Sequence, residues 1–321
     1  MIIGPAVSLS THDLVGGVEL PARGTRGQNR CRCLIMLKLE TVQDAHDYLR
    51  PHRQVGQRIG LVPTMGALHE GHRSLMRAAR NDCDQVVVSI FVNPTQFGPG
   101  EDLERYPRPI ETDLAACRHE SVDAVFCPSV AEMYPEGSVT TVTVNRLAQG
   151  LCGAHRPGHF NGVTTVVAKL FNIVQPDAAY FGQKDAQQAV VIRRMTRDLL
   201  WPIEIVVCPT IREADGLAMS SRNVYLSPHE RTQACCLHAA LEWARQQIEA
   251  GRQDARPLLD KMRELIEAAG PCRIDYIELV DADDLTPKAV ALGRCLLALA
   301  VHIGKARLID NVVVDAAGPS R

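Results

Sequence analysis

Residues 59–92 read IGLVPTMGALHEGHRSLMRAARNDCDQVVVSIFV, and this stretch decides the fold. Its apolar run at 59–62 predicts a buried strand, and the spacing of apolar residues over 72–81 predicts a helix. The run at 86–92 is apolar on both faces, as expected of a central strand in a parallel sheet. Parallel strands are joined by crossover connections, usually helices. The stretch therefore predicts an α/β protein.

The same alternation of helices and strands continues on both sides of this stretch. Further helices are expected over 41–49, 110–119, 163–174 and 186–199, and further strands over 124–127, 178–181 and 203–208. Beyond about Ile211 the pattern changes to two helical segments and three apolar runs, at 228–250, 255–269, 274–280, 295–303 and 306–314. We therefore predict a doubly wound parallel sheet over 36–211 and a smaller C-terminal α+β domain with an antiparallel sheet over 212–321.

Composition narrows the class of protein. The 321 residues include 35 Lys and Arg against 37 Asp and Glu, so the net charge of -2 gives no reason to expect nucleic-acid binding. No apolar run approaches the ~20 residues that span a bilayer. The eleven cysteines are odd in number, irregularly spaced and without a Cys-x-x-Cys pair, which favours reduced thiols over disulfides or zinc ligands. We expect a soluble, cytoplasmic protein that binds neither nucleic acid nor membranes.

The first 35 residues differ from the rest. They contain five glycines and no sustained apolar period, and they lack the basic and apolar regions of a secretory signal. We expect residues 1–35 to be an N-terminal extension, disordered or non-native, with Met36 as the natural start. Mass spectrometry of the protein from its native source tests this hypothesis, and an intact Met1 terminus would contradict it.

The chemistry is expected where the strands end, because ligands of doubly wound sheets bind beyond the carboxyl ends of the strands. Residues 63–72 follow one strand and open a helix, whose N-terminus favours an anion. Gly66 and Gly71 permit close backbone approach, and His69 and His72 are spaced to face one ligand. Zinc would need four-residue histidine spacing, so the motif favours phosphate. The alternative is a capping turn with surface histidines.

Two further strand ends carry polar side chains. Asn93 and Gln96 offer neutral hydrogen-bonding groups for a hydroxyl or carboxylate, although a plain turn explains them equally well. Lys184 can neutralise phosphate charge and Asp185 can accept from ribose hydroxyls, with Gln188 one turn further on. A solvated surface ion pair is the alternative for the lysine and aspartate.

A fourth cluster, residues 212–223, lies at the expected domain boundary. Ser220, Ser221 and Arg222 give two hydroxyls and a guanidinium that can bind phosphate oxygens. The turn at Asp215 and its position between domains suggest a mobile clamp over a nucleotide.

Together these clusters resemble the pantoate–β-alanine ligase (pantothenate synthetase) family of the HIGH-motif nucleotidyltransferase-like superfamily. The resemblance extends over 36–314 and rests on five long segments in the family's order, namely 62–72, 88–97, 156–160, 182–188 and 219–223. Residues 69–72 resemble the HIGH signature, and residues 219–222 resemble the counterpart of the KMSKS loop. The resemblance implies a Rossmann-like sheet with a C-terminal lid domain.

The resemblance also implies a reaction in pantothenate biosynthesis, the precursor pathway of coenzyme A. Pantoate attacks the α-phosphorus of ATP, with Mg²⁺ carried by the nucleotide, and gives pantoyl adenylate and pyrophosphate. The amine of β-alanine then displaces AMP and gives pantothenate. The implied partners are pantoate, β-alanine and ATP, and the implied assembly is a cytoplasmic homodimer.

Site residues follow from the resemblance by matching positions. The implied catalytic residues are His69, His72, Lys184 and Arg222. The implied ATP site comprises Met65, Gly66, Ala67, Leu68, His69, Glu70, Gly71, His72, Gly182, Gln183, Lys184, Asp185, Ile211, Met219, Ser220, Ser221 and Arg222. The implied pantoate site comprises Gln96, Gln188 and Asn93, with Gln96 also near β-alanine, and no protein ligand for a metal is assigned. Gln183 stands where the family often has Glu.

Three questions stay open from the sequence. His72 carries the family's proton-donor role, but a histidine can equally stabilise phosphate charge by hydrogen bonding, and phosphoryl chemistry favours the latter. A nucleotidyltransferase of the same superfamily is an alternative, which the Gln96 and Gln188 pair disfavours. A non-enzymatic metal or redox module is the third, built on Cys31, Cys33, His155, His159, Cys235 and Cys236.

Overall fold

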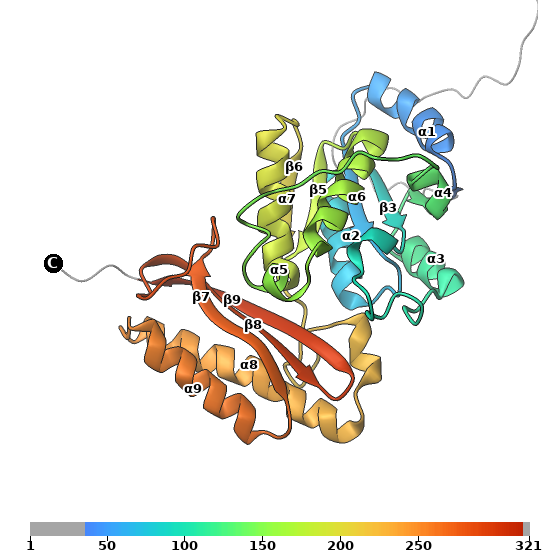
Figure 1. The fold of residues 1–321 in the computed structure, drawn as a ribbon. Coiled ribbons are helices and arrows are strands. Elements are labelled where there is room, and N and C mark those ends of the chain that lie inside the picture. Colours follow the sequence, from blue (N-terminus) through green and yellow to red (C-terminus); the bar gives the residue numbers. More distant parts are fainter. Residues whose placement is uncertain (1–35, 317–321) are drawn as a thin grey trace, which may run out of the picture. The chain divides into compact units, whose positions relative to one another are not determined.

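The computed structural model describes residues 36–316. Six strands form a parallel sheet, namely β1 (Leu37–Leu39), β2 (Ile59–Thr64), β3 (Gln85–Ile90), β4 (Ala124–Phe126), β5 (Ala178–Gly182) and β6 (Glu204–Cys208). The helices between them are α1 (Val42–Gln54), α2 (Glu70–Asp82), α3 (Ile110–His119), α4 (Val130–Met133), α5 (Cys152–His155), α6 (His159–Val174) and α7 (Ala186–Asp198). This part of the structure confirms the predicted fold class (Figure 1).

The strand order is β1-β4-β3-β2-β5-β6, so the direction of winding reverses between β2 and β5. The carboxyl ends of these two strands are neighbours, and a doubly wound sheet binds its ligand at such a switch point. The topology therefore brings the loop after β2 and the loop after β5 to one edge, although 118 positions separate Thr64 from Gly182.

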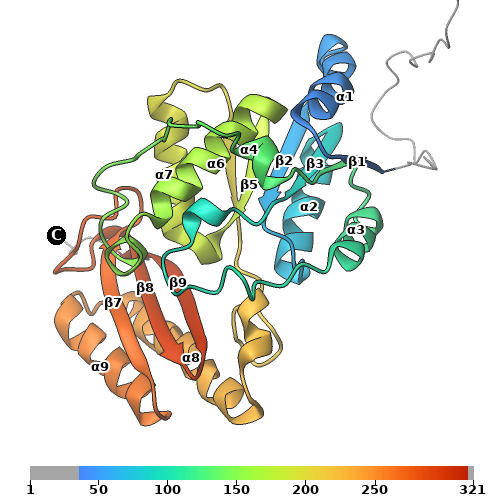
Figure 2. The ribbon, with the colours of Figure 1, turned by 45° about the vertical axis from the view of Figure 1, so that its right-hand side comes forward.

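Helices cover both faces of the sheet. Buried side chains of α1, α6 and α7 form one hydrophobic core with Ile59 and Leu61, and those of α2 and α3 form another with Val62 and Val88. Consecutive residues of β2 thus enter opposite cores, which explains why the strand is apolar on both faces. The two layers are visible in Figures 1 and 2.

The C-terminal part is a second, antiparallel sheet with the order β7-β8-β9. It consists of β7 (Arg273–Asp281), β8 (Gly293–Ile303) and β9 (Ala306–Ala316), and it is preceded by α8 (Pro228–Glu249) and α9 (Ala255–Ala268). Alternate residues such as Leu297 and Leu299 pack against α8 and α9, whereas Leu296 and Ala298 belong to the core around the parallel sheet. One face of this sheet is thus covered by its own helices, and the other faces the parallel-sheet part (Figure 2).

Some local structure differs from the sequence-based expectation. The helix α6 begins at His159, four residues before the expected start, and α1 continues through Pro51 to Gln54. The elements β1, α4 and α5 and three short 3-10 helices were not predicted, because each spans only three to five residues. These 3-10 helices are η1 (Pro94–Gln96), η2 (Gln183–Asp185) and η3 (Ser221–Tyr225).

Two expectations, one about the N-terminus and one about the domain boundary, remain open. Residues 1–35, with the proposed start at Met36 and with Cys31 and Cys33, lie outside the described residues. The division of 36–321 at residue 211 also stays a prediction. Within the described residues, no helix is long and apolar enough to cross a membrane.

Candidate active site

The loop between β2 and α2 is held by a buried carboxylate. Gly66 and Ala67 both adopt left-handed backbone angles, with φ of +83° and 50°. Asp113, on α3 and only 1% exposed, accepts hydrogen bonds from the N–H groups of Ala67 (2.9 Å) and Leu68 (2.8 Å). A Cβ atom at Gly66 would lie 2.9 Å from the Asp113 carboxylate, so a larger residue would displace it. Two N–H groups that the sequence offered to an anionic ligand are therefore already bound within the protein.

The two histidines of this loop cap the helix with their own side chains. Nδ1 of His69 accepts from the N–H of Gly71 (3.1 Å), and Nδ1 of His72 accepts from the N–H of His69 (3.3 Å). The rings lie side by side with centroids 4.1 Å apart, as the spacing predicts. Because both Nδ1 atoms accept, each neutral ring carries its proton on Nε2. These hydrogen bonds fix two N–H donors on adjacent rings.

Both histidines are neutral near pH 7. Burial, with a smaller contribution from Lys184, lowers the pKa of His69 to about 4. Burial also lowers the pKa of His72 well below its usual value, and His69 and Lys184 act in the same direction. A neutral imidazole is a poor proton donor but a good hydrogen-bond donor. The electrostatics thus favour hydrogen bonding over proton transfer for His72.

Residues after β3 form a closed hydrogen-bond network. Asn93 is 1% exposed, and its carbonyl oxygen accepts from the hydroxyls of Thr95 (2.9 Å) and Tyr134 (2.9 Å). Its amide donates to the carbonyl of Gly162 (3.1 Å) and to Oε1 of Gln96 (3.1 Å). The Asn93 side chain is therefore committed internally and orients Gln96.

Residues after β5 are arranged differently. Within residues 36–316, the side chains of Lys184, Asp185 and Gln188 make no hydrogen bond or ion pair with the protein. The side chain of Gln183 instead donates to Oδ1 of Asn311 on β9 (2.9 Å). The Asn311 amide donates in turn to the carbonyls of Gln183 (3.0 Å) and Lys184 (2.9 Å). The backbone at Lys184 is thus anchored while its ammonium is free to meet a ligand.

The guanidinium of the fourth cluster is already paired. Nε and Nη2 of Arg222 donate to the two oxygens of Asp102, at 3.0 and 2.9 Å. Burial opposes ionisation of Asp102, but the hydrogen bonds from Arg222 outweigh it and hold the pKa of the carboxyl below its usual value. Among the contacts of the described residues, Nη1 of Arg222 remains for a ligand.

Most of the expected site residues line one cavity of about 230 Å³. The predicted residues around it are Met65, His69, Gly71, His72, Asn93, Gln96, Gly182, Lys184, Asp185, Gln188, Ile211, Met219, Ser220, Ser221 and Arg222. The predicted residues Gly66, Ala67, Leu68, Glu70 and Gln183 do not line it, and Glu70 pairs with Arg73 and Arg77 on the surface of α2.

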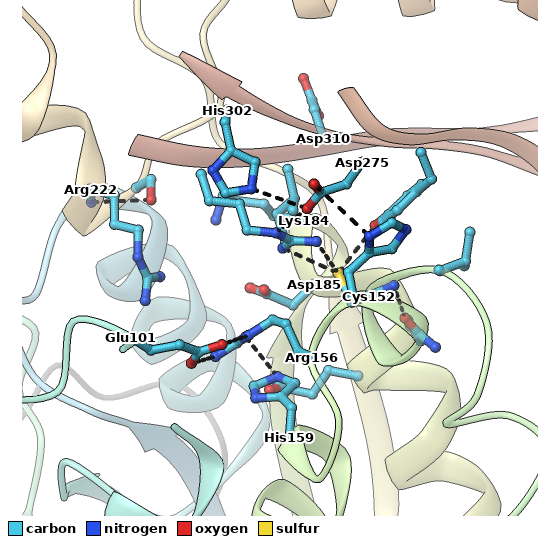
Figure 3. Close-up of a pocket in the computed structure, with 18 of the residues that line it drawn as sticks. Glu101, Cys152, Arg156, His159, Lys184, Asp185, Arg222, Asp275, His302 and Asp310 are labelled. Atoms are coloured by element: carbon cyan, nitrogen blue, oxygen red, sulfur yellow. Dashed lines mark hydrogen bonds and ion pairs between the residues drawn. The ribbon is translucent and has the colours of Figure 1, made fainter. Parts of the chain in front are cut away.

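A larger cavity of about 600 Å³ adjoins the first and extends to the antiparallel sheet. Seven residues line both, namely Arg156, His159, Lys184, Asp185, Gln188, Ser220 and Arg222. In Figure 3, Lys184 and Asp185 lie between Asp275 and His302 on one side and Arg156 and His159 on the other. His69 and His72 line only the smaller cavity, and the larger one shares Lys184 and Arg222 with it.

Sequence reasoning missed the acidic partners that hold the site. Asp113 could have been found, because it is a carboxylate on the apolar face of a predicted helix, next to Leu114 and Cys117. Asp102 and Glu101 carried no such signal. Glu101 accepts two hydrogen bonds from Arg156, at 2.7 and 2.6 Å, across 55 positions of sequence.

The metal or redox alternative gains no support. Among the residues that the structure describes, no group of three or more His, Cys, Asp or Glu could hold a metal ion. The nine cysteines of that part are free thiols.

Comparison with known proteins identifies relatives along most of the chain. A family model described as Pantoate-beta-alanine ligase matches residues 37–313. Pantothenate synthetase of Moorella thermoacetica is 58% identical, with 86% of this chain and 98% of the relative covered. The enzyme of Heliobacterium modesticaldum is 56% identical, with 87% and 100% covered.

Solved structures agree. Pantothenate synthetase from Thermus thermophilus is similar with a TM-score of 0.82 and 47% identity, covering 86% of this chain and 99% of that one. Pantoate-beta-alanine ligase from Francisella tularensis, complexed with beta-gamma ATP and beta-alanine, has a TM-score of 0.73 and 36% identity, covering 87% and 97%.

Proposed function

Because the chain belongs to the pantoate-beta-alanine ligase family, whose known reaction is the ATP-dependent condensation of pantoate with β-alanine, we propose that it catalyses this reaction in the smaller cavity. The Francisella relative, solved with an ATP compound and β-alanine, supports the same two ligands here. The chain is thus a ligase of pantothenate biosynthesis.

The reaction takes two steps. A carboxylate oxygen of pantoate forms a bond to the α-phosphorus of ATP, and the bond from that phosphorus to the bridging oxygen breaks, so pyrophosphate leaves. The β-alanine nitrogen then forms a bond to the acyl carbon and loses a proton. The bond from that carbon to the oxygen that bridges it to phosphorus breaks, so AMP leaves with this oxygen. Adenylation makes AMP the leaving group, and the protein has to orient the reactants and stabilise charge.

His69, His72 and Lys184 provide that stabilisation. The Nε2–H groups of the two neutral histidines donate hydrogen bonds to phosphate oxygens, at fixed positions set by their Nδ1 bonds. Lys184, which has no ion-pair partner in the described part of the chain, adds a full positive charge at the same cavity. Ser220, Ser221 and Nη1 of Arg222 complete the phosphate contacts. His72 acts as a hydrogen-bond donor and not as an acid.

The substrates occupy different walls. Gln96 and Gln188 bind the polar groups of pantoate, with Gln96 also near β-alanine, and Asn93 keeps Gln96 in place. The apolar wall of α6 suits the methyl groups of pantoate; it comprises Val163, Val166, Val167 and Leu170. Gly182 and Asp185 hold the ribose, and the backbone of Ile211 contacts the adenine.

Mg²⁺ fits this site only as a companion of ATP. Asp185 is the one carboxylate on the lining of the smaller cavity, among the described residues, so the protein offers few of the oxygen ligands that Mg²⁺ prefers. Phosphate oxygens and water would supply the rest. From the family resemblance we further propose that the protein is a cytoplasmic homodimer.

The observation that carries this proposal is the fixed pair of Nε2–H donors beside an unpaired lysine. The test is a coupled AMP-release assay with ATP, pantoate and β-alanine, each omitted in turn. Stoichiometric AMP and pantothenate only with all three substrates is the expected result. A dinucleotide-like product from ATP and a phosphate acceptor would overturn the proposal in favour of a nucleotidyltransferase.

A further inference from the structure

The larger cavity carries a surplus of positive charge. Its lining includes seven Lys or Arg, namely Arg105, Arg156, Lys184, Arg222, Arg273, Lys305 and Arg307. It includes five carboxylates, namely Glu101, Asp102, Asp185, Asp275 and Asp310. The whole chain has a net charge of -2, so the net charge of this cavity lining is opposite in sign to that of the whole chain. A concave, cationic surface attracts anions.

One buried carboxylate organises the wall that the antiparallel sheet contributes. Asp275 on β7, with a side chain 3% exposed, lies 2.9 Å from Nη1 of Arg273 and 2.8 Å from Nε of Arg307. Nε2 of His302 lies 3.2 Å from the same carboxylate (Figure 3). Burial lowers the pKa of His302 despite this carboxylate, so His302 adds no charge near pH 7. Two guanidinium groups thus share one negative charge and are held in place by it.

These cations retain unused hydrogen-bonding capacity. Within the described part of the chain, Nη1 and Nη2 of Arg307 donate only to the sulfur of Cys152, at 3.6 and 3.7 Å, and sulfur is a weak acceptor. Lys305, in the turn between β8 and β9, is exposed and makes no ion pair with any described residue. The wall therefore presents N–H donors toward the cavity without acceptors of matching strength.

The residues shared by the two cavities indicate which anion can reach the wall formed by the antiparallel sheet. His69 and His72 line only the smaller cavity, whereas Lys184, Ser220 and Arg222 line both. In the proposed function, attack at the α-phosphorus expels the β- and γ-phosphates away from pantoate. A leaving group bound at the shared residues has the larger cavity on its other side.

We propose that Arg273, Lys305 and Arg307 form a subsite for inorganic pyrophosphate, which receives the product as it leaves Lys184 and Arg222. The proposal rests on the proposed function, because that reaction generates the anion. Pyrophosphate is a multiply charged anion with no apolar part, and it needs several cations with free N–H groups. The subsite supplies these at some remove from the histidines, so the product clears the α-phosphate position before β-alanine attacks.

The test compares two substitutions in the subsite with a matched control. Lys305→Met removes an unpaired charge, and Arg307→Lys keeps the charge while losing the planar donor pair. Lys261→Met is the control, since Lys261 lies on α9, outside the cavity lining, and pairs with Glu264 at 2.9 Å. Calorimetric titration with sodium pyrophosphate alone gives the Kd, and product inhibition of AMP release gives Ki. Thermal unfolding verifies that each variant folds.

We expect Lys305→Met and Arg307→Lys each to raise the pyrophosphate Kd and Ki about fivefold, and the ratio of Ki to the KM for ATP by the same factor. Equal weakening of ATP and pyrophosphate would overturn the proposal, because the cluster would then belong to the ATP site. Values that match Lys261→Met would overturn it as well. Failure of the wild-type protein to form AMP would instead contradict the proposed function, and the calorimetric Kd would remain a separate readout.

Discussion

The loop after β2 and the segment 219–222 were both predicted to bind phosphate, and they are built in opposite ways. In the β2–α2 loop, His69 and His72 are fixed by backbone N–H groups within three residues of each ring. In the segment 219–222, the guanidinium of Arg222 is fixed by Asp102, 120 positions away. The first arrangement leaves neutral donors in preset positions, and the second leaves a cation that a distant loop aligns. The proposed phosphate site thus combines a local, rigid part with a part assembled across the fold.

The rigid part should carry the largest effect. We expect His72→Ala to lower the rate of adenylate formation about 100- to 1000-fold, because a preorganised donor to developing charge is lost. Pantoate affinity should change less than about threefold, since His72 is not expected to contact pantoate. Rapid-quench measurement of pyrophosphate formation in one turnover gives the rate, and Lys184→Ala should behave alike. A near-normal rate in either variant would show that the side chain removed in that variant is dispensable for adenylate formation.

The support beneath the rigid part should matter next. Asp113→Asn replaces one acceptor oxygen with an NH₂ group facing a backbone N–H, so the loop between Gly66 and His69 should shift. We expect kcat to fall about tenfold and the free energy of unfolding to fall by about 1–3 kcal/mol, measured by steady-state kinetics and urea denaturation. Asp47→Asn on α1, which removes one exposed ion pair with Arg50, is the matched control. Unchanged kcat with lowered stability would reduce Asp113 to a structural residue.

The distant alignment predicts a smaller effect on binding. Asp102→Asn should raise the KM for ATP about fivefold while kcat changes less than about twofold, because Arg222 keeps its charge and loses its orientation. The measurement is a full kinetic analysis with ATP varied at saturating pantoate and β-alanine. A lower KM for ATP would show the reverse relation, in which Asp102 competes with phosphate for the guanidinium.

The smallest expected effect is that of low pH on the free energy of unfolding, which should involve His69 in the β2–α2 loop but not the ion pair of Asp102 with Arg222. Folding lowers the pKa of His69 to about 4, so between about pH 6.5 and pH 4 the unfolded chain binds the proton and the folded chain does not. Stability should therefore fall as the pH drops through this window, by about 2 kcal/mol from His69 between pH 7.5 and pH 5. The pKa of Asp102 is held low, so its ion pair persists over most of that range.

His69→Asn tests this assignment, since asparagine keeps a helix-capping oxygen but does not titrate. Urea denaturation at about pH 7.5, 6 and 5 should give a shallower pH dependence for the variant than for the wild type. Identical slopes would place the acid sensitivity elsewhere, for example at His159, whose pKa burial and Arg156 also lower to about 4.

The same contrast explains what sequence could and could not predict. The β2–α2–β3 unit was predicted nearly to its boundaries. The spacing of its apolar residues and the glycine in the loop between β2 and α2 are local signals that can be read from the sequence. Most candidates that line the smaller cavity follow strand ends, which the parallel topology must bring together; the segment 219–222 lies beyond the sheet. Asp102 could not be found because its role exists only after folding: an isolated carboxylate in sequence does not indicate which N–H group it accepts from. Asp113 gives a local signal, a carboxylate on the apolar face of a predicted helix, but the sequence does not show that it accepts from Ala67, 46 positions away. The short elements β1, α4 and α5 lacked enough residues to show a period.

Asn311 has a mechanical consequence. This one side chain of β9 makes two hydrogen bonds with Gln183 and a third with the carbonyl of Lys184, so the antiparallel sheet grips the turn that carries the lysine. If the antiparallel sheet moves relative to the parallel sheet, these three hydrogen bonds would carry the turn at Lys184 with it. The distance from the Lys184 ammonium to the proposed phosphate site would then change together with the position of the sheet. Opening the cleft and loosening the nucleotide would then be one motion and not two.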